Sequence, residues 1–261
     1  MGFSEHELWV ERRDPRDEGR NCRLFGLLRI PDEGDGPFPA VICAHGFTAN
    51  HSEADPYAMA LAEGGFVTLA IDFFGGGMGI RSDGTLLDMT VETEAEDLSL
   101  FLDALRQRED VDEGRIGLLG CSQGGFVSTM VASRRPGDVF RLALMYPAFV
   151  LHDDALRLYP DEADIPDTYL AFEGYEPSRI SRAYNLCARA TDPYPLMERY
   201  QRPCLIAHGD ADIVVPLRYS RKAAKTFADA RLHIVEAGTH GFSGDALEQA
   251  KRLVCDFFCE N

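Results

Sequence analysis

The sequence has no segment of the kind that crosses a membrane or directs export. Its first residues, MGFSEHELWVERRD, contain no basic start followed by an apolar core, and no run of eighteen apolar residues occurs in the 261-residue chain. We therefore expect neither a signal peptide nor a membrane span. A cytoplasmic location is the expectation that follows.

Basic residues are scarce. Lys and Arg total 26 against 43 Asp and Glu, which gives a formal net charge of −17. A charge of that sign repels phosphate backbones and anionic lipid surfaces, so neither nucleic acid nor a membrane is expected as a partner. The acidic residues are spread along the chain, which is typical of a solvated surface.

Metal-binding and disulfide patterns are absent. No Cys-x-x-Cys pair occurs and the seven histidines do not fall at zinc-ligand spacing, so the sequence predicts no metal site. The seven cysteines are odd in number, and several lie inside apolar runs, where a thiol packs as a small hydrophobic group. Reduced cysteines are expected.

Short apolar runs, many of which end in glycine or an acidic residue, alternate with stretches of helical apolar spacing. This order predicts one α/β domain with a mostly parallel central sheet covered by helices on both faces. The segments ELWVERRD and CRLFGLLRIP add an antiparallel pair at the sheet edge. The strands are expected at 38–46, 65–72, 114–120, 141–147, 203–210 and 231–238, and helices at 57–63, 91–106, 218–227 and 245–258.

Residues 147–201 break this alternation. The segment is rich in Asp, Pro and Tyr, with helical fragments and no clear strand. A connection this long inside a compact sheet protein is usually functional, so we interpret it as a helical cap inserted in a core domain made of 1–146 and 202–261. The alternative is a peripheral insertion without a role in the site.

The stretch GLLGCSQGGFVS places Ser122 in a turn between a predicted strand and a predicted helix. Gly120-x-Ser122-x-Gly124 in this context is typical of a nucleophile elbow, in which the serine occupies a strained backbone position. Side chains at Gly120, Gly124 and Gly125 would collide with the neighbouring strand and helix. Cys121 stands one position before the centre of the motif and is expected to pack inward.

Two later loops supply a base and an acid for this serine. Asp212 follows the strand at 203–210 and His240 follows the strand at 231–238, so the order is Ser, Asp, His. An unaided serine is a weak nucleophile at neutral pH and needs a histidine that a carboxylate orients. Asp210 is the competing acid, although a turn-forming role suits it better.

Two backbone amides are candidates for an oxyanion hole. One belongs to Phe47, in the loop HGFTAN after the first parallel strand, and the other to Gln123, directly after the candidate nucleophile. His45 and His208 are expected to stabilise strand ends. Asp72 is expected to be part of a loop structure, and His6, His51, His152 and His233 have no partner that the sequence identifies.

With HGFTAN, GCSQGG, HGDADIVVP and GTHGF in place, the chain resembles the α/β-hydrolase superfamily from about Phe38 to the C-terminus. More narrowly it is similar to the bacterial cinnamoyl or feruloyl esterases, through HGF, CSQGG and the cap segment DEADIPD. The segment DFFGGGMGIRSDG is longer than the corresponding turn of those esterases and lacks its histidine, so the pocket wall there is expected to differ.

The resemblance implies Ser122 as nucleophile, His240 as base, Asp212 as acid, and the amides of Phe47 and Gln123 as oxyanion donors, without a cofactor. It also implies a cap that covers an aromatic acyl group. Within the segment 147–201, Tyr159, Tyr169 and Asp154 are candidates for binding a phenolic hydroxyl, although a tyrosine in a helical cap more often packs. The predicted function is hydrolysis of small carboxylic esters of the feruloyl type through an acyl-enzyme. Two alternative functions stay open. One is a serine peptidase of the prolyl-peptidase kind, which usually carries a large extra domain not evident here, and the other is a non-catalytic binding protein. A homodimer also stays open.

Overall fold

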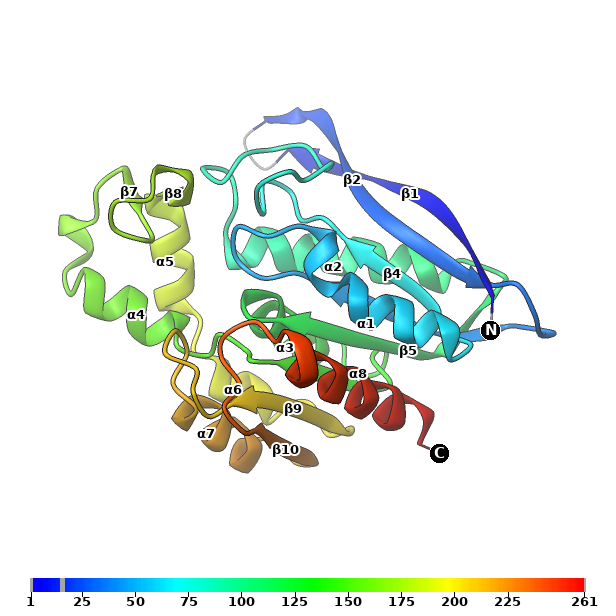
Figure 1. Ribbon diagram of the computed structural model, residues 1–261. Coiled ribbons are helices and arrows are strands. Elements are labelled where there is room, and N and C mark those ends of the chain that lie inside the picture. The colour runs from blue at the N-terminus through cyan, green and yellow to red at the C-terminus, as the bar shows by residue number, and fades with distance from the viewer. Residues whose placement is uncertain (1, 15–16, 261) are drawn as a thin grey trace.

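The computed structural model describes residues 2–14 and 17–260 and has the expected α/β architecture (Figure 1). Eight strands form one sheet in the order β1-β2-β4-β3-β5-β6-β9-β10. Their bounds are β1 Phe3–Asp14, β2 Asp17–Pro31, β3 Phe38–Ala44, β4 Val67–Ile71, β5 Val111–Cys121, β6 Leu142–Met145, β9 Cys204–Gly209 and β10 Ala230–Val235.

The sheet is parallel except at its N-terminal edge. β1 pairs antiparallel with β2, and β2 pairs antiparallel with β4. From β4 through β3, β5, β6 and β9 to β10, all neighbours are parallel. The prediction of a mostly parallel sheet with an antiparallel pair at its edge is therefore confirmed.

Helices cover both faces of the sheet, because the central strands are apolar on both sides; all five residues of β4 are buried. α1 (His51–Glu63) and α8 (Gly244–Cys259) pack on one face around Tyr57, Phe257 and Phe258. α2 (Val91–Arg106), α3 (Gln123–Arg134), α6 (Pro193–Met197) and α7 (Arg218–Thr226) pack on the other face. The two apolar clusters on either side of the sheet form the core.

The predicted bounds lie within a few residues of the observed ones, except that α1 begins six residues before the stretch 57–63. Its first turn is set by Asn50, whose side chain accepts a hydrogen bond from the Ser52 amide as an N-cap. Pro56 lies inside this helix, in its second turn. The polar first turn has no apolar periodicity, which is why the sequence pattern places the start too late.

The segment 147–201 contains α4 (Leu151–Leu158), α5 (Arg182–Ala190) and α6, which packs against α3. It also contains a two-stranded antiparallel sheet of β7 (Thr168–Leu170) and β8 (Arg179–Ser181). The expectation that this segment has no clear strand is therefore wrong: three-residue strands are too short to show alternation in the sequence. In Figure 1, α4, α5, β7 and β8 stand to one side of the large sheet.

Among the described helices, none combines the length and the apolar character needed to cross a bilayer. The seven cysteines, all within the described part of the chain, are unpaired thiols.

Candidate active site

Ser122 stands in the tight turn between β5 and α3, with φ 49° and ψ −116°. A positive φ is strained for a residue with a side chain, and the surrounding hydrogen bonds hold it there. The Ser122 amide donates to the Met145 carbonyl at 2.9 Å, and the Ser122 carbonyl accepts from the amides of Gly125 and Ala148 at 3.0 and 2.9 Å. The serine is thus fixed from both sides of its peptide.

The glycines beside Ser122 are needed because backbone approaches them closely. A Cβ on Gly120 would lie 2.3 Å from the Gly124 carbonyl oxygen, and a Cβ on Gly124 would lie 2.4 Å from the His45 carbonyl oxygen. At Gly125 the nearest atom would be the Pro147 Cβ at 2.9 Å. Any side chain at the first two positions would push β5, α3 and the loop after β3 apart.

Ser122, His240 and Asp212 form one continuous hydrogen-bonded line. His240 Nε2 lies 2.9 Å from Ser122 Oγ, and His240 Nδ1 lies 2.8 Å from Asp212 Oδ2. The Tyr146 ring packs edge-on against the imidazole, with ring centroids 5.0 Å apart. A histidine that accepts from the serine hydroxyl through Nε2 must carry its own proton on Nδ1, where the carboxylate accepts it.

The loops that carry Asp212 and His240 come together because they leave adjacent parallel strands. The Ala211 amide donates to the Gly238 carbonyl at 3.0 Å, and Gly209 lies so close to Gly238 that an added Cβ would be 2.0 Å from its oxygen. The carboxylate and the imidazole therefore meet beyond the carboxyl ends of β9 and β10, which is where parallel sheets form their sites.

Four donors surround the Asp212 carboxylate. Oδ1 accepts from the amides of Val214 and Val215 at 2.9 Å each, while Oδ2 accepts from His240 and lies 3.2 Å from His208 Nε2. Burial by itself raises the pKa of Asp212, but the hydrogen bonds from His208, His240 and Val215 outweigh it, and the net pKa is below the usual range. Asp212 is therefore ionised at neutral pH.

His208 stabilises the end of β9, as the sequence suggests, and it also contacts the acid. Its Nδ1 lies 2.7 Å from Ser220 Oγ, and its Nε2 lies 2.9 Å from the Val215 carbonyl. The sequence patterns do not predict the contact between His208 and Asp212. The one local signal for it is that the two residues stand four positions apart at the end of a predicted strand.

Asp210 and Asp72 lie outside the line. Asp210 Oδ1 accepts from the Ala237 amide at 2.7 Å and ties the two loops together. Asp72 accepts from the amides of His51 and Arg81, both at 2.7 Å, and from His51 Nδ1 at 2.9 Å. Burial raises the pKa of Asp72, yet these bonds bring it below its usual value. Both carboxylates organise loops, and His51 has a partner that the sequence does not reveal.

The loop after β3 is held by hydrogen bonds on both sides of Gly46. His45 Nδ1 donates to the Gly46 carbonyl at 2.8 Å, while His45 Nε2 accepts from the Phe73 amide at 3.2 Å. The Gly46 amide donates to Glu53 Oε2 at 2.5 Å. Because a trans peptide is planar, fixing the Gly46 carbonyl also fixes the direction of the Phe47 N–H.

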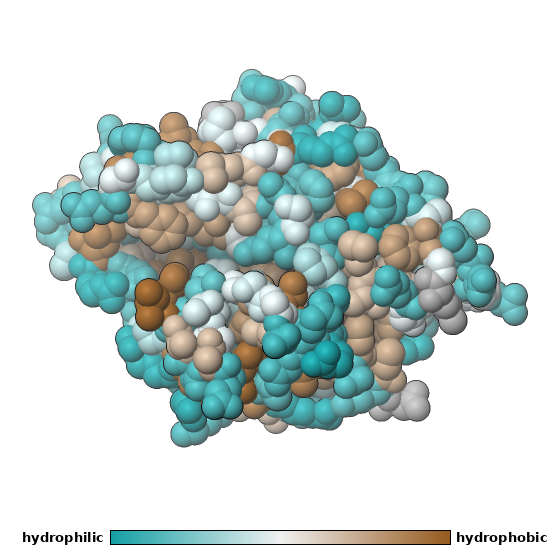
Figure 2. Space-filling model, viewed as in Figure 1, coloured by the Kyte–Doolittle hydropathy of each residue, from teal (hydrophilic) through white to brown (hydrophobic). Residues whose placement is uncertain are grey.

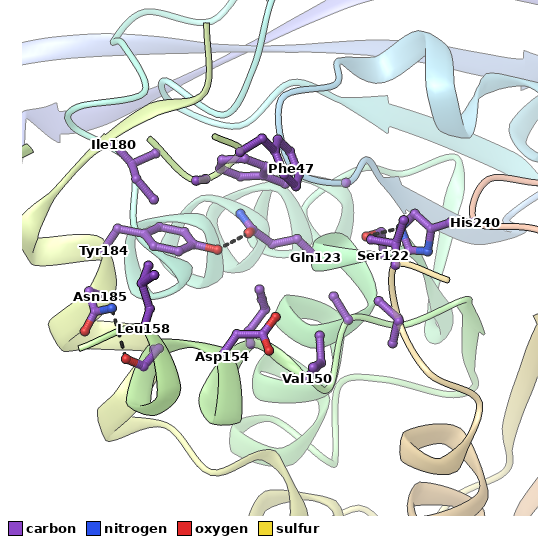
Figure 3. Close-up of a pocket in the computed structure, with 18 of the residues that line it drawn as sticks. Phe47, Ser122, Gln123, Val150, Asp154, Leu158, Ile180, Tyr184, Asn185 and His240 are labelled. Atoms are coloured by element: carbon purple, nitrogen blue, oxygen red, sulfur yellow. Dashed lines mark hydrogen bonds between the residues drawn. The ribbon is translucent and has the colours of Figure 1, made fainter. Parts of the chain in front are cut away.

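The second candidate oxyanion amide belongs to Gln123, the first residue of α3. Amides of the first helical turn have no acceptor within the helix, and the helix dipole favours negative charge in front of them. Phe47 and Gln123 both line the cavity beside Ser122 (Figure 3). Cys121 is fully buried, and burial raises the pKa of its thiol well above the usual range, so it packs as expected.

A cavity of about 310 Å³ extends from Ser122 and His240 toward the segment 147–201. Its wall is mostly apolar, and the acidic side chains among its described lining residues are Glu53 and Asp154. Figure 2 shows the hollow, with hydrophobic residues around its mouth. The exposed apolar side chains that belong to this lining are Leu158, Phe172 and Val214.

Polar groups lie among the apolar ones in the half of the cavity that 147–201 forms. Asp154 points into it (Figure 3), and burial raises the pKa of Asp154 although Arg157 is bonded to it at 2.7 Å. Tyr169 and Asn185 also line the cavity, whereas Tyr159 packs against the Tyr169 ring at 5.3 Å and is not part of the described lining. The loop 72–84 contributes no residue to that lining either.

This chain is similar in sequence to one protein family and to several known hydrolases. The sequence pattern of the prolyl oligopeptidase family matches residues 52–261. The human serine hydrolase BPHL is 21% identical over 247 residues, which cover 88% of this chain and 82% of that protein. The bis(hydroxyethyl) terephthalate hydrolase of Streptomyces coelicolor is 36% identical over 116 residues, 42% of this chain and 34% of that one.

Two other curated relatives are matched over a short part of their length. The chain spans 33% of the length of two uncharacterized Escherichia coli proteins that are 35% identical over 99 residues. Among solved structures, Est1E from Butyrivibrio proteoclasticus with ferulic acid bound is similar with a TM-score of 0.82 and 26% identity. That match covers 90% of this chain and 94% of Est1E.

Proposed function

Since this chain belongs to the prolyl oligopeptidase family and is a hydrolase with the α/β-hydrolase fold, we propose that it is a serine esterase that cleaves small aromatic carboxylic esters. One observation carries the proposal: the hydrogen-bonded line from Asp212 through His240 to Ser122 opens directly onto a mostly apolar cavity. A nucleophile, its base and a place for the acyl group therefore adjoin one another.

In the proposed reaction, Ser122 Oγ attacks the ester carbonyl carbon while its proton passes to His240 Nε2, 2.9 Å away. The carbonyl oxygen becomes an oxyanion that accepts hydrogen bonds from the amides of Phe47 and Gln123; each donor of this kind is worth about 3 kcal/mol of barrier. The C–O bond to the alcohol then breaks, and His240 returns the proton to the leaving alcohol.

The second half of the reaction repeats these steps with water. His240 takes a proton from a water molecule as the water attacks the acyl-serine, and then protonates Ser122 Oγ as the acid leaves. The ionised Asp212 stabilises the imidazolium in both halves, because its Oδ2 accepts from Nδ1 at 2.8 Å. No net proton or electron is required from another group.

An aromatic acyl group suits the cavity. The rings of Phe47, Phe172 and Tyr184 form part of its wall, and a flat ring buries a large apolar area against such a wall. At the side formed by 147–201, Asp154 can accept a hydrogen bond from a phenolic hydroxyl, and Tyr169 can donate or accept one. The likeness to Est1E, whose structure holds ferulic acid, supports this choice. We accordingly propose that 147–201 acts as a cap over the acyl site.

A serine peptidase is the second candidate, and the family match is what favours it. Both reactions use the same nucleophile and base. An amide demands more of them, because its carbonyl is less electrophilic and His240 must protonate the amine before it leaves. The experiment is a comparison of methyl ferulate, chlorogenate, methyl acetate, methyl butyrate and dipeptide amides.

We expect methyl ferulate or chlorogenate to be hydrolysed fastest and the dipeptide amides not at all. A Ser122→Ala variant should lose this activity, because nothing else in the line can attack the carbonyl. Acetate and butyrate far ahead of ferulate would contradict the aromatic preference, and amide turnover without ester turnover would favour the peptidase. Normal turnover by Ser122→Ala would contradict the esterase proposal itself.

A further inference from the structure

One side chain of the segment 147–201 contacts both residues whose amides we propose as oxyanion donors. Tyr184, on α5, donates its hydroxyl to Gln123 Oε1 at 2.5 Å, and its ring centroid lies 5.9 Å from that of Phe47. Figure 3 shows the hydroxyl of Tyr184 directed at Gln123, with Phe47 close by and Ser122 beyond. Phe47 lies in the loop after β3 and Gln123 is the first residue of α3, so Tyr184 connects two separate parts of the core.

The side chain of Gln123 is held at both ends of its amide. Its Nε2 donates to Glu94 Oε2 on α2 at 2.8 Å, opposite the bond from Tyr184. Gln123 is fully buried and Glu94 is 1% exposed, so water cannot replace either partner. Burial raises the pKa of Glu94 well above its usual value, against a smaller opposing effect of the hydrogen bond from Gln123, and the nearby Asp97 carboxylate raises it further.

These contacts restrict the backbone that the reaction depends on. Gln123 is the first residue of α3, and its N–H belongs to the same residue as the clamped side chain. A buried amide with two fixed partners has one arrangement, because turning it away would leave polar atoms unpaired. The direction of the Gln123 N–H is therefore coupled to the position of Tyr184.

We propose that Tyr184 is a positioning residue for the oxyanion hole: its hydroxyl holds Gln123, its ring packs on Phe47, and both donor amides thereby depend on the placement of α5. This inference rests on the proposed function, since it assumes that the two amides stabilise an oxyanion. It assigns to the segment 147–201 a role in transition-state stabilisation, in addition to enclosing the acyl group.

The test is the rate at which a fluorophosphonate reacts with Ser122, because the phosphoryl oxygen occupies the oxyanion position in that reaction. Tyr184→Phe removes one oxygen atom and leaves Gln123 Oε1 without its donor. We expect the bimolecular rate to fall about tenfold, less than the loss of an entire donor, which costs about 10²–10³-fold. Equal rates for the wild type and Tyr184→Phe would overturn the inference.

Tyr200→Phe is the matched control. Tyr200 is buried like Tyr184, donates its hydroxyl to the Val139 carbonyl at 3.3 Å, and is not among the described residues that line the cavity. Tyr200→Phe loses the same atom from a buried position, so a general effect of deleting a buried hydroxyl appears in it too. We expect Tyr200→Phe to react at the wild-type rate; a matching tenfold loss would overturn the inference.

A double-mutant cycle separates positioning from direct contact. Gln123→Leu keeps the backbone N–H at position 123 but removes the side-chain amide that Tyr184 and Glu94 hold. In this variant, the further change Tyr184→Phe should slow the reaction by less than twofold. If the double mutant instead shows the product of the two single-mutant rate losses, Tyr184 acts independently of Gln123 and the inference is overturned. With a p-nitrophenyl ester, Tyr184→Phe should lower kcat and leave KM within twofold, whereas a raised KM at unchanged kcat would indicate contact with substrate and overturn the inference.

Two further outcomes are distinguishable. If the wild type fails to react with the fluorophosphonate, the proposed function itself fails. If Tyr184→Phe does not fold, as judged by thermal melting, Gln123→Leu carries the same expectation, because it cuts the same link from the other end. A Gln123→Leu variant that folds and reacts at the wild-type rate would then overturn the inference.

Discussion

Replacing Asp212 by Asn tests the hydrogen-bonded line from Asp212 through His240 to Ser122, because it exchanges one carboxylate oxygen for an NH₂ group of similar size. The Asn oxygen can still accept from the amides of Val214 and Val215, which lie 2.9 Å from Asp212 Oδ1, so the loop keeps its anchors. The new NH₂ group then takes the position of Oδ2, which is 2.8 Å from His240 Nδ1. A donor now faces two nitrogens that were themselves donating to Oδ2: His240 Nδ1 and His208 Nε2, the latter at 3.2 Å.

The consequence for His240 follows from its two ring nitrogens. To meet the NH₂ group, Nδ1 must become the acceptor, and the ring proton moves to Nε2, 2.9 Å from Ser122 Oγ. An imidazole in that tautomer cannot take the serine proton, and no carboxylate remains to stabilise its charged form. A loss of this kind costs about 10⁴-fold in kcat, which corresponds to about 5 kcal/mol of barrier.

The assay is kcat for a p-nitrophenyl ester at neutral pH, with thermal melting to show that Asp212→Asn is folded. Asp210→Asn is the control, because Asp210 Oδ1 accepts from the exposed Ala237 amide and an Asn oxygen can do the same. We expect at least a thousandfold loss in Asp212→Asn and less than a threefold change in Asp210→Asn. A loss of kcat below tenfold in Asp212→Asn, or an equal loss in Asp210→Asn, would show that Asp212 does not set the tautomer of His240.

Three other perturbations have defined outcomes. Glu94 holds its proton to a higher pH in the folded chain than in the unfolded one, so its contribution to stability is present at low pH and declines as pH rises. Glu94→Gln keeps an oxygen that can accept from Gln123 and does not titrate, so the Tm of this variant relative to the wild type should rise between pH 5 and pH 8. A difference in Tm that stays constant with pH would contradict the raised pKa. Gly124→Ala places a Cβ 2.4 Å from a backbone carbonyl oxygen and should lower the free energy of unfolding by about 1–3 kcal/mol, while Gly137→Ala, with nothing within 4 Å, should not. The described lining residues of the cavity include no Lys or Arg, and most of its wall is apolar, so the carboxylate of monomethyl terephthalate would lose its hydration there without gaining a cationic partner. We expect this monoester to be hydrolysed at least about tenfold more slowly than the dimethyl ester; similar rates would show that the acyl group does not enter this cavity.

The main strands and helices, and the residues of the hydrogen-bonded line, were predictable because short stretches of sequence encode them. Ser122, Asp212 and His240 each follow a buried strand, and the carboxyl ends of parallel strands meet at one edge of a sheet. The glycines around Ser122 mark a turn that a side chain would block, and that requirement is visible in five residues of sequence. Alternation of strand and helix predicts the sheet for the same reason.

What the sequence did not reveal depends on side chains that meet across the fold. Tyr184 and Glu94 reach Gln123 from α5 and α2, and neither has a spacing to Gln123 that any local pattern would select. The strands β7 and β8 are three residues long, and their pairing joins residues 168 and 181 across an irregular loop. Such contacts follow from tertiary packing, which one sequence without its relatives does not specify.

The central claim is that His240 activates Ser122 as a nucleophile. The most direct measurement is mass-spectrometric mapping of the adduct that a fluorophosphonate forms with the wild type, Ser122→Ala and His240→Ala. We expect a single adduct on Ser122 in the wild type, none in Ser122→Ala, and a greatly slowed reaction in His240→Ala. An unlabelled wild type, or an adduct on another residue that persists in Ser122→Ala, would contradict it.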